Sequence, residues 1–237
     1  MLVEKQSFLR PEPLRINGFF GESLSCTEAI GEIRRLGRGT WLPLQIEKYR
    51  ELFERMQNLN SVPNHDLPHN LRVLLYTRPI LKLMETAIGE MFDSAAVEAV
   101  AIEHDRRRSG IKFDWWHGWL ASRDLKTDFY WLSPKSLELA AQICKWHSVE
   151  DSLTPPWIKN KIEWAVFCDA DNLDRTRIGD FNPKYLRLFP SSIMVSVAKE
   201  LCSLSAKNLQ RGAGGFDAVI EAGQEIGLIE KTNESRL

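Results

Sequence analysis

Apolar residues recur at steps of three and four along most of the chain, which is the spacing of one face of an α-helix. In residues 1–95 this pattern predicts helices over 27–36, 46–59 and 71–91. Pro79 falls inside the third stretch and is expected to interrupt it, because proline lacks a donor and restricts the residue before it. The N-terminal third is therefore expected to hold three or four amphipathic helices.

The pattern changes at about residue 96, where short runs have strand-like composition. Residues 97–104 and 111–116 are joined by a polar turn that ends in glycine, which favours a hairpin. Residues 129–132 are a candidate third strand. Together these runs predict a small antiparallel β-meander.

Helical spacing returns in the C-terminal half, with a recognisable start or stop for each helix. Ser133-Pro134, Pro155-Pro156 and Pro190-Ser191 are expected to begin helices, and Gly227 is expected to end the last one. The predicted fold class is mainly α (α+β), with amphipathic helices around a small central β-meander. An N-terminal helical region, 1–95, and a region from 96 to 237 are expected to form one compact unit.

Composition points to an ordinary globular protein, with 43% hydrophobic and 27% charged residues. The formal net charge of −1 excludes binding of nucleic acid or an anionic membrane by overall charge, so such binding needs a local patch. The chain lacks a signal-peptide core, and no apolar run is long enough to cross a bilayer. We therefore expect a cytoplasmic protein without membrane contact, in which four widely spaced cysteines are reduced thiols: Cys26, Cys144, Cys168 and Cys202.

The largest departure from average composition is a cluster of tryptophan and arginine. Seven of the eight tryptophans lie between Trp115 and Trp164, and three consecutive arginines occupy the predicted hairpin turn. Arginine neutralises phosphate and an exposed indole stacks on unpaired bases, so the cluster predicts a nucleic-acid site. The alternative is a solvated turn beside indoles that build the core. The candidate contact residues are Arg106, Arg107, Arg108, Lys112, Trp116 and Trp119.

A second basic stretch lies between residues 181 and 211, where Glu200 is the only glutamate and no aspartate occurs. It is followed by an acidic C-terminal stretch, so the two surfaces could bind nucleic acid and a protein partner, or could match each other within the molecule. The candidate phosphate contacts are Lys184, Arg187, Lys199, Lys207 and Arg211.

An apolar run at 165–168 leads into three closely spaced carboxylates, Asp169, Asp171 and Asp174. Hard oxygen ligands of this kind suit Mg²⁺. The string resembles the first motif of NYN-type nucleases and of haloacid-dehalogenase phosphatases, which implies a metal-dependent phosphoryl-transfer site with Asp169 and Asp171 as ligands. In those families the motif opens the domain, whereas here only residues 175–237 follow it. A helix that runs into an acidic turn is the alternative.

The five histidines are scattered along the sequence. Pro68 argues against a regular helical ligand pair from His65 and His69, and no cysteine lies nearby to complete a zinc site. His147 is expected to be a core histidine on the buried face of its helix. The dipeptide 104–105 and the pair Asp114 and His117 are expected to meet across the hairpin as a general acid and base.

These features favour a non-catalytic nucleic-acid-associated protein, a subunit of a larger assembly with protein partners, and they predict no cofactor. DNA and RNA are not distinguished. One alternative is a Mg²⁺-dependent phosphoesterase or nuclease that uses the aspartates. The other is a protein-interaction adaptor with a tryptophan-rich interface, since indole and arginine are frequent at binding hot spots.

Overall fold

The computed structural model describes residues 24–37, 39–57, 65–110 and 114–231. These residues form helices joined by short connections, and no strand occurs among them. The helices are α1 (Cys26–Gly37), α2 (Pro43–Glu47), α3 (Arg50–Gln57), α4 (Leu67–Ile88), α5 (Ser94–Glu103), α6 (Trp116–Asp128), α7 (Pro134–Trp146), α8 (Pro156–Lys159), α9 (Ile162–Asp174), α10 (Phe189–Gln210) and α11 (Gly215–Ile226), with 3₁₀ turns at η2 (Arg175–Ile178) and η3 (Pro183–Tyr185).

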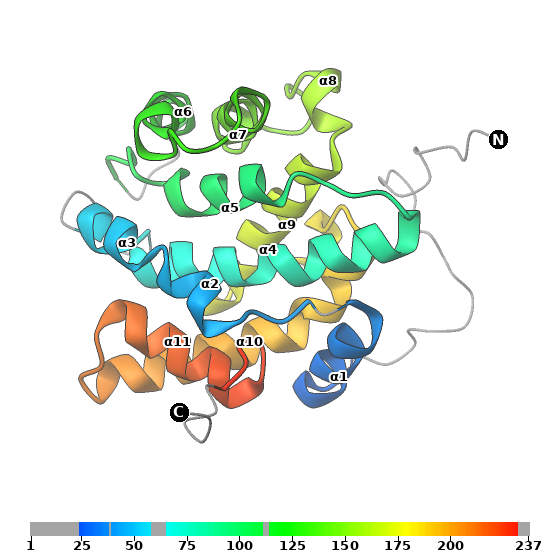
Figure 1. Ribbon diagram of the computed structural model, residues 1–237, viewed down its shortest axis with the longest axis vertical. Coiled ribbons are helices and arrows are strands. Elements are labelled where there is room, and N and C mark those ends of the chain that lie inside the picture. The colour runs from blue at the N-terminus through cyan, green and yellow to red at the C-terminus, as the bar shows by residue number, and fades with distance from the viewer. Residues whose placement is uncertain (1–23, 38, 58–64, 111–113, 232–237) are drawn as a thin grey trace.

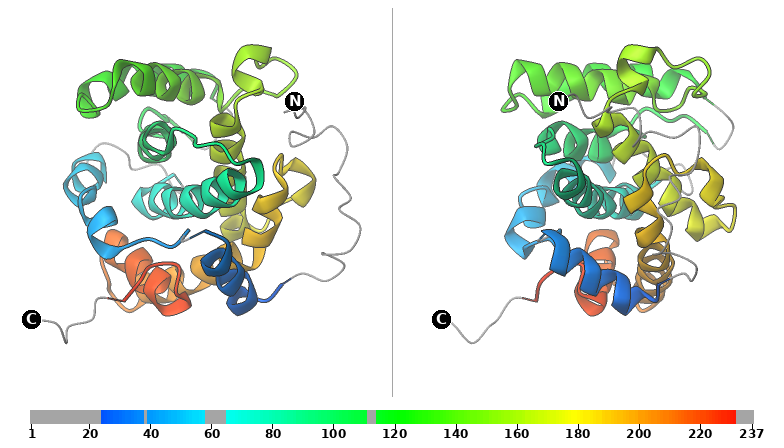
Figure 2. Two further views of the ribbon diagram at one scale, coloured as in Figure 1. Left: turned by 45° about the vertical axis from the view of Figure 1, so that its right-hand side comes forward. Right: turned by 90° about the vertical axis from the view of Figure 1, so that its right-hand side faces the viewer.

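Helix α4 is the centre of the arrangement (Figure 1). It packs against α5 and α9 on one side and against α1, α10 and α11 on the other. The hairpin of α6 and α7 covers α5 and forms the top of the view, while α10 and α11 form the bottom. Figure 2 shows the same order of layers from two further directions. The N-terminal helices therefore pack directly against the C-terminal ones.

Helix α4 continues through Pro79, so the expected interruption there is wrong. A proline at this position leaves the carbonyl of Leu75, four residues earlier, without its helical donor. The indole Nε1 of Trp41 donates to that carbonyl at 3.1 Å. A tertiary hydrogen bond thus replaces the missing helical one, which sequence spacing could not reveal.

Several predicted helix ends are confirmed at the atomic level. The Ser133 side chain accepts a hydrogen bond from the backbone N–H of Ser136 and caps α7. Gly227 follows α11 in the left-handed conformation, with φ of 81°, which favours glycine. The predicted stretch 46–59 is divided into α2 and α3, and its last residues lie outside the described part of the chain.

The predicted β-meander is wrong. Residues 97–104 belong to α5 and its C-terminal cap, and 129–132 form a turn after α6. Residues 111–113 lie outside the described residues, and Trp116 begins α6. The error has a physical cause: α5 is buried on nearly every side, so its run of alanine, valine and isoleucine lacks an amphipathic period. A short apolar run of this kind cannot be distinguished from a buried strand by periodicity.

Candidate metal centre

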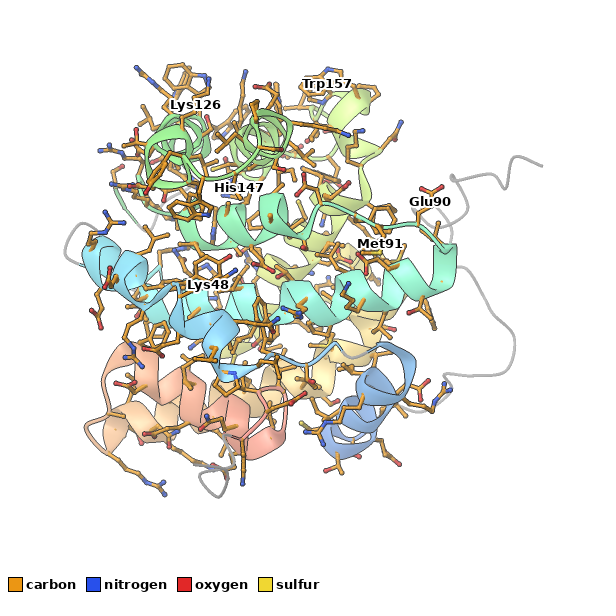
Figure 3. All side chains as sticks on the ribbon, in the orientation of Figure 1. Lys48, Glu90, Met91, Lys126, His147 and Trp157 are labelled. Carbon is orange, nitrogen blue, oxygen red and sulfur yellow. The ribbon has the colours of Figure 1, made fainter. Side chains whose placement is uncertain are left out.

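The fold brings all five histidines of the chain into one cluster beside α4. They come from the ends of different helices, which approach one another where α4 begins and α5 and α7 end. Figure 3 shows His147 on the side of α7 that faces α5. Aspartates from the end of α5 and from α9 complete the cluster, whose members are His65, His69, His104, Asp105, His117, His147, Asp171 and Asp174.

The first half of the cluster is a pair of imidazoles, His69 and His104, whose Nε2 atoms lie 3.2 Å apart. The Nδ1 of His69 lies 2.7 Å from the Asp174 carboxylate, and the Nδ1 of His104 lies 3.2 Å from the carbonyl of Ala101. An acceptor at Nδ1 fixes the proton on that nitrogen in a neutral imidazole. When both rings are neutral, both Nε2 lone pairs therefore point into the space between the two rings.

Two carboxylates face the same space. Oδ2 of Asp105 lies 3.3 Å from the Nε2 of His69 and 3.4 Å from the Nε2 of His104. Oδ1 of Asp171 lies 3.5 and 3.8 Å from the same two nitrogens. Two imidazole nitrogens and two carboxylate oxygens thus converge on one point.

A second pair of imidazoles repeats this geometry. The Nε2 atoms of His117 and His147 lie 3.0 Å apart, and Oδ1 of Asp105 is 3.3 Å from the former. The Nδ1 of His117 contacts the carbonyl of Asp114, and the Nδ1 of His147 lies 2.6 Å from the carbonyl of Cys144. Asp105 therefore presents one oxygen to each histidine pair.

Lone pairs that face each other at this distance repel unless a proton or a cation lies between them. Bonds of about 2.1 Å from one ion to both nitrogens would give an angle at the metal of about 90–100° for these separations. Imidazole and carboxylate together suit Zn²⁺, Mn²⁺ and Fe²⁺. The donor set could hold two divalent ions, one at each histidine pair, with Asp105 offering one oxygen to each, and such a pair of ions would supply two-metal hydrolytic chemistry.

The surroundings of each group in the cluster shift its pKa, and the direction differs from group to group. Burial opposes the charge of His69, but hydrogen bonds to Asp105 and Asp174 outweigh it and raise its pKa to about 9. Burial, together with the neighbouring His117 and His104, lowers the pKa of His147 to about 3. The pKa of Asp105 is well below its ordinary value, because contacts with His104, His117 and His65 outweigh the opposing effect of its burial.

Asp174 contacts the cluster through the Nδ1 atom of His69. Its side chain is fully buried, and its carboxylate accepts from Arg72 Nε at 2.6 Å and from Arg177 Nη1 at 2.8 Å. Although burial acts in the opposite direction, Arg72 and His69 hold the pKa of Asp174 below its ordinary value. An anionic Asp174 fixes the ring orientation and tautomer of His69, as carboxylates behind metal-bound histidines do.

One side of the cluster is open to solvent. The Asp171 side chain is 37% exposed and that of His65 is 17% exposed. Nη1 of Arg108 lies 3.6 Å from Oδ1 of Asp105 and brings a positive charge to the centre. The arrangement offers a site for a solvent-derived nucleophile and an anion.

The three aspartates of α9 do not act together. A step of three residues puts Asp171 and Asp174 on one helix face, whereas Asp169 points elsewhere. The Asp169 carboxylate accepts from the backbone N–H groups of Arg187 and Leu188, each at 2.8 Å, and from Ser191 Oγ at 2.7 Å. Asp169 therefore fixes the start of α10, and the motif lies on a helix rather than at the end of a strand.

The candidate phosphate contacts fall into separate places. Arg106 pairs with Glu103 and Asp128, and Arg107 pairs with Asp124. Arg187 pairs with Asp151 at 2.6 Å, and Lys112 lies outside the described residues. The exposed basic residues of α10 and its C-cap lie at the opposite end of the molecule from α6 (Figure 1). These exposed residues are Lys199, Lys207 and Arg211, and Lys184 is exposed on η3.

The expected meeting of 104–105 with His117 does occur, although through helix ends and not across a hairpin. The approach of Asp171 to His69 and His104 was missed, because the separations of these residues in sequence are large and irregular. The adjacent histidine and aspartate at 104–105 are the local signal that points to this site.

No protein-family model matches this chain, and neither a curated protein nor a solved structure is significantly similar to it. Among the described residues, no helix combines the length and apolar character that crossing a bilayer requires.

Proposed function

We propose that this protein is a metal-dependent hydrolase of phosphate esters. The observation that carries the proposal is the pair of facing Nε2–Nε2 contacts, His69 with His104 and His117 with His147, joined by the two oxygens of Asp105. Each contact places two lone pairs and a carboxylate around a point that a divalent ion would fill.

The chain supplies ligands on both sides of that carboxylate. His69, His104 and Asp171 would hold one ion, and His117 and His147 would hold the second. Two such ions activate water and neutralise the charge of a phosphoryl group. Arg108, beside Asp105, supports an anionic substrate because its guanidinium can donate to phosphate oxygens.

The test is hydrolysis of bis(p-nitrophenyl) phosphate by metal-stripped protein after addition of Mn²⁺, Fe²⁺ or Zn²⁺. We expect activity that depends on metal and is lost in Asp105→Asn. Asp180→Asn is the matched control, because Asp180 pairs with Arg175 on the surface. Failure of the stripped wild-type protein to bind any of these ions would refute the proposal.

The non-catalytic nucleic-acid function expected from composition stays a prediction, as does membership of a larger assembly. The alternative of a Mg²⁺-dependent phosphoesterase or nuclease that uses the aspartates is close to this proposal but assigns them different roles. Asp171 is kept as a ligand, Asp174 becomes a positioning residue, and Asp169 is left out.

A further inference from the structure

Helix α6 carries an exposed stripe of aromatic and basic side chains, here called the α6 stripe: Trp116, Trp119, Arg123 and Lys126. Steps of three and four residues keep all four on one helix face. Trp116 is 68% exposed and Trp119 is 39% exposed, although tryptophan is usually buried. Figure 3 shows Lys126 at the top of the molecule, on the side away from α4.

The α6 stripe is positively charged because the acids of the helix are already paired. Asp124 binds Arg107, and Asp128 binds Arg106. Among the described residues, no carboxylate lies within ion-pair distance of Arg123 or Lys126. The Arg123 guanidinium instead lies 5.4 Å from the ring centre of Trp119. The stripe therefore combines flat apolar rings with uncompensated charge.

One end of the α6 stripe adjoins the metal centre. Trp116 directly precedes His117, whose Nε2 faces His147. The carbonyl of Trp115 accepts from Ser148 Oγ at 3.4 Å, which ties the start of α6 to the residue after His147. His117 is only 1% exposed and lies on the inner face of α6, so the stripe and the second histidine pair occupy opposite sides of this helix.

We infer that the α6 stripe binds a single-stranded nucleic acid, which would be the substrate of the proposed phosphoesterase. The inference rests on the proposed phosphoesterase function and names its substrate class. Unpaired bases stack on indole rings, and arginine and lysine neutralise the phosphates. Duplex ends offer few free base faces, so the stripe favours single strands.

The test is binding of a fluorescein-labelled twenty-nucleotide oligo(dT) to the full chain in EDTA, where no hydrolysis occurs. Each base stack contributes about tenfold or more in affinity, so Trp116→Ala/Trp119→Ala is expected to weaken binding by at least tenfold. Trp157→Ala is the control, because Trp157 is 56% exposed on α8 and outside the stripe (Figure 3).

Charge is tested separately by Arg123→Glu against Lys231→Glu, which reverses an exposed charge near the C-terminus. We expect only Arg123→Glu to weaken binding and reduce its dependence on salt. Equal binding by all variants, absence of binding by the wild type, or a preference for duplex would overturn the inference.

The two proposals fail in distinguishable ways. Stripe-dependent binding without any metal-dependent hydrolysis would leave the inference standing as binding alone and would refute the proposed function. Hydrolysis of the small phosphodiester without stripe-dependent binding would support the proposed function and refute the inference.

Discussion

The Nε2 atoms of His117 and His147 lie 3.0 Å apart, while the Nδ1 of each ring faces a backbone carbonyl. The backbone thus fixes which nitrogen of each ring carries the proton, and leaves two lone pairs directed at each other. This second pair lies between α6 and α7, and its His147 ring is centred 5.3 Å from the ring of His104 in the first pair. Substituting one histidine of each pair tests whether the two halves of the centre bind metal independently.

The first prediction concerns the number of bound ions. We expect the wild type to bind two divalent ions per chain, His147→Ala to bind one, and His69→Ala to lose the other. Metal analysis after dialysis against Mn²⁺ or Zn²⁺ measures this directly. Asp105→Asn should weaken both ions, since its carboxylate faces both pairs. Loss of all metal in His147→Ala would contradict independent halves.

The second prediction concerns protons. His69 has a pKa of about 9 in the metal-free protein, so at pH 7.5 it holds a proton that coordination must displace. Metal affinity should therefore rise with pH, by up to about tenfold per unit, and level off near pH 9. Calorimetric titration in buffers of different ionisation enthalpy reports the released proton.

Asp174→Asn is the matched variant for that titration. The Asp174 carboxylate is one of the contacts that raise the pKa of His69, so its neutralisation should reduce proton release at pH 7.5. Equal release by the variant and the wild type would mean that another group loses the proton.

The third prediction concerns Gly118, where α6 packs against the end of α7. A Cβ at Gly118 would lie 2.5 Å from the Cys144 carbonyl and 2.9 Å from the His147 ring. Gly118→Ala should push the helices apart and displace His147, with loss of the second ion and retention of the first. Gly31→Ala on α1 is the control and should bind both ions, because, beyond its own stretch of helix, none of the described residues has an atom within 4 Å of the Cβ position. Binding of both ions by Gly118→Ala would contradict this prediction, because it would mean that α6 and α7 can move apart without displacing His147.

The fourth prediction concerns Glu103 at the end of α5. Burial raises its pKa to about 7 against the opposing effect of Arg106. Because this pKa is higher in the folded state, the stability it contributes is complete below the unfolded pKa near 4.5 and is lost as pH rises through 7. The loss is about 3 kcal/mol between pH 4.5 and pH 8.

Glu103→Gln should remove that loss and flatten the dependence of stability on pH. Urea unfolding of the variant and wild type at both ends of this range measures the difference. Glu138→Gln, on the exposed side of α7, is the control and should follow the wild type. Parallel curves for Glu103→Gln and wild type would contradict a buried, titrating Glu103.

Much of the helical structure could be predicted, because helix starts and stops depend on residues close in sequence. Ser133 caps α7 and Gly227 ends α11, as local rules require. The strand prediction at 97–104 was wrong because a helix buried on all sides loses its period. Pro79 lies inside α4 because Trp41, which is remote in sequence, donates to the freed carbonyl.

The candidate site was predicted only in fragments. The contact between Asp105 and His117 and the choice of Asp171 as a ligand could be anticipated, whereas the partnership of His69 with His104 could not. The sequence by itself determined most of the helix starts and ends, the choice of Asp171 as a possible ligand, and that residues 115–126 carry indoles beside basic residues. Only the tertiary structure decided that five scattered histidines meet around Asp105, because metal-site geometry depends on how helix ends pack and not on residue spacing.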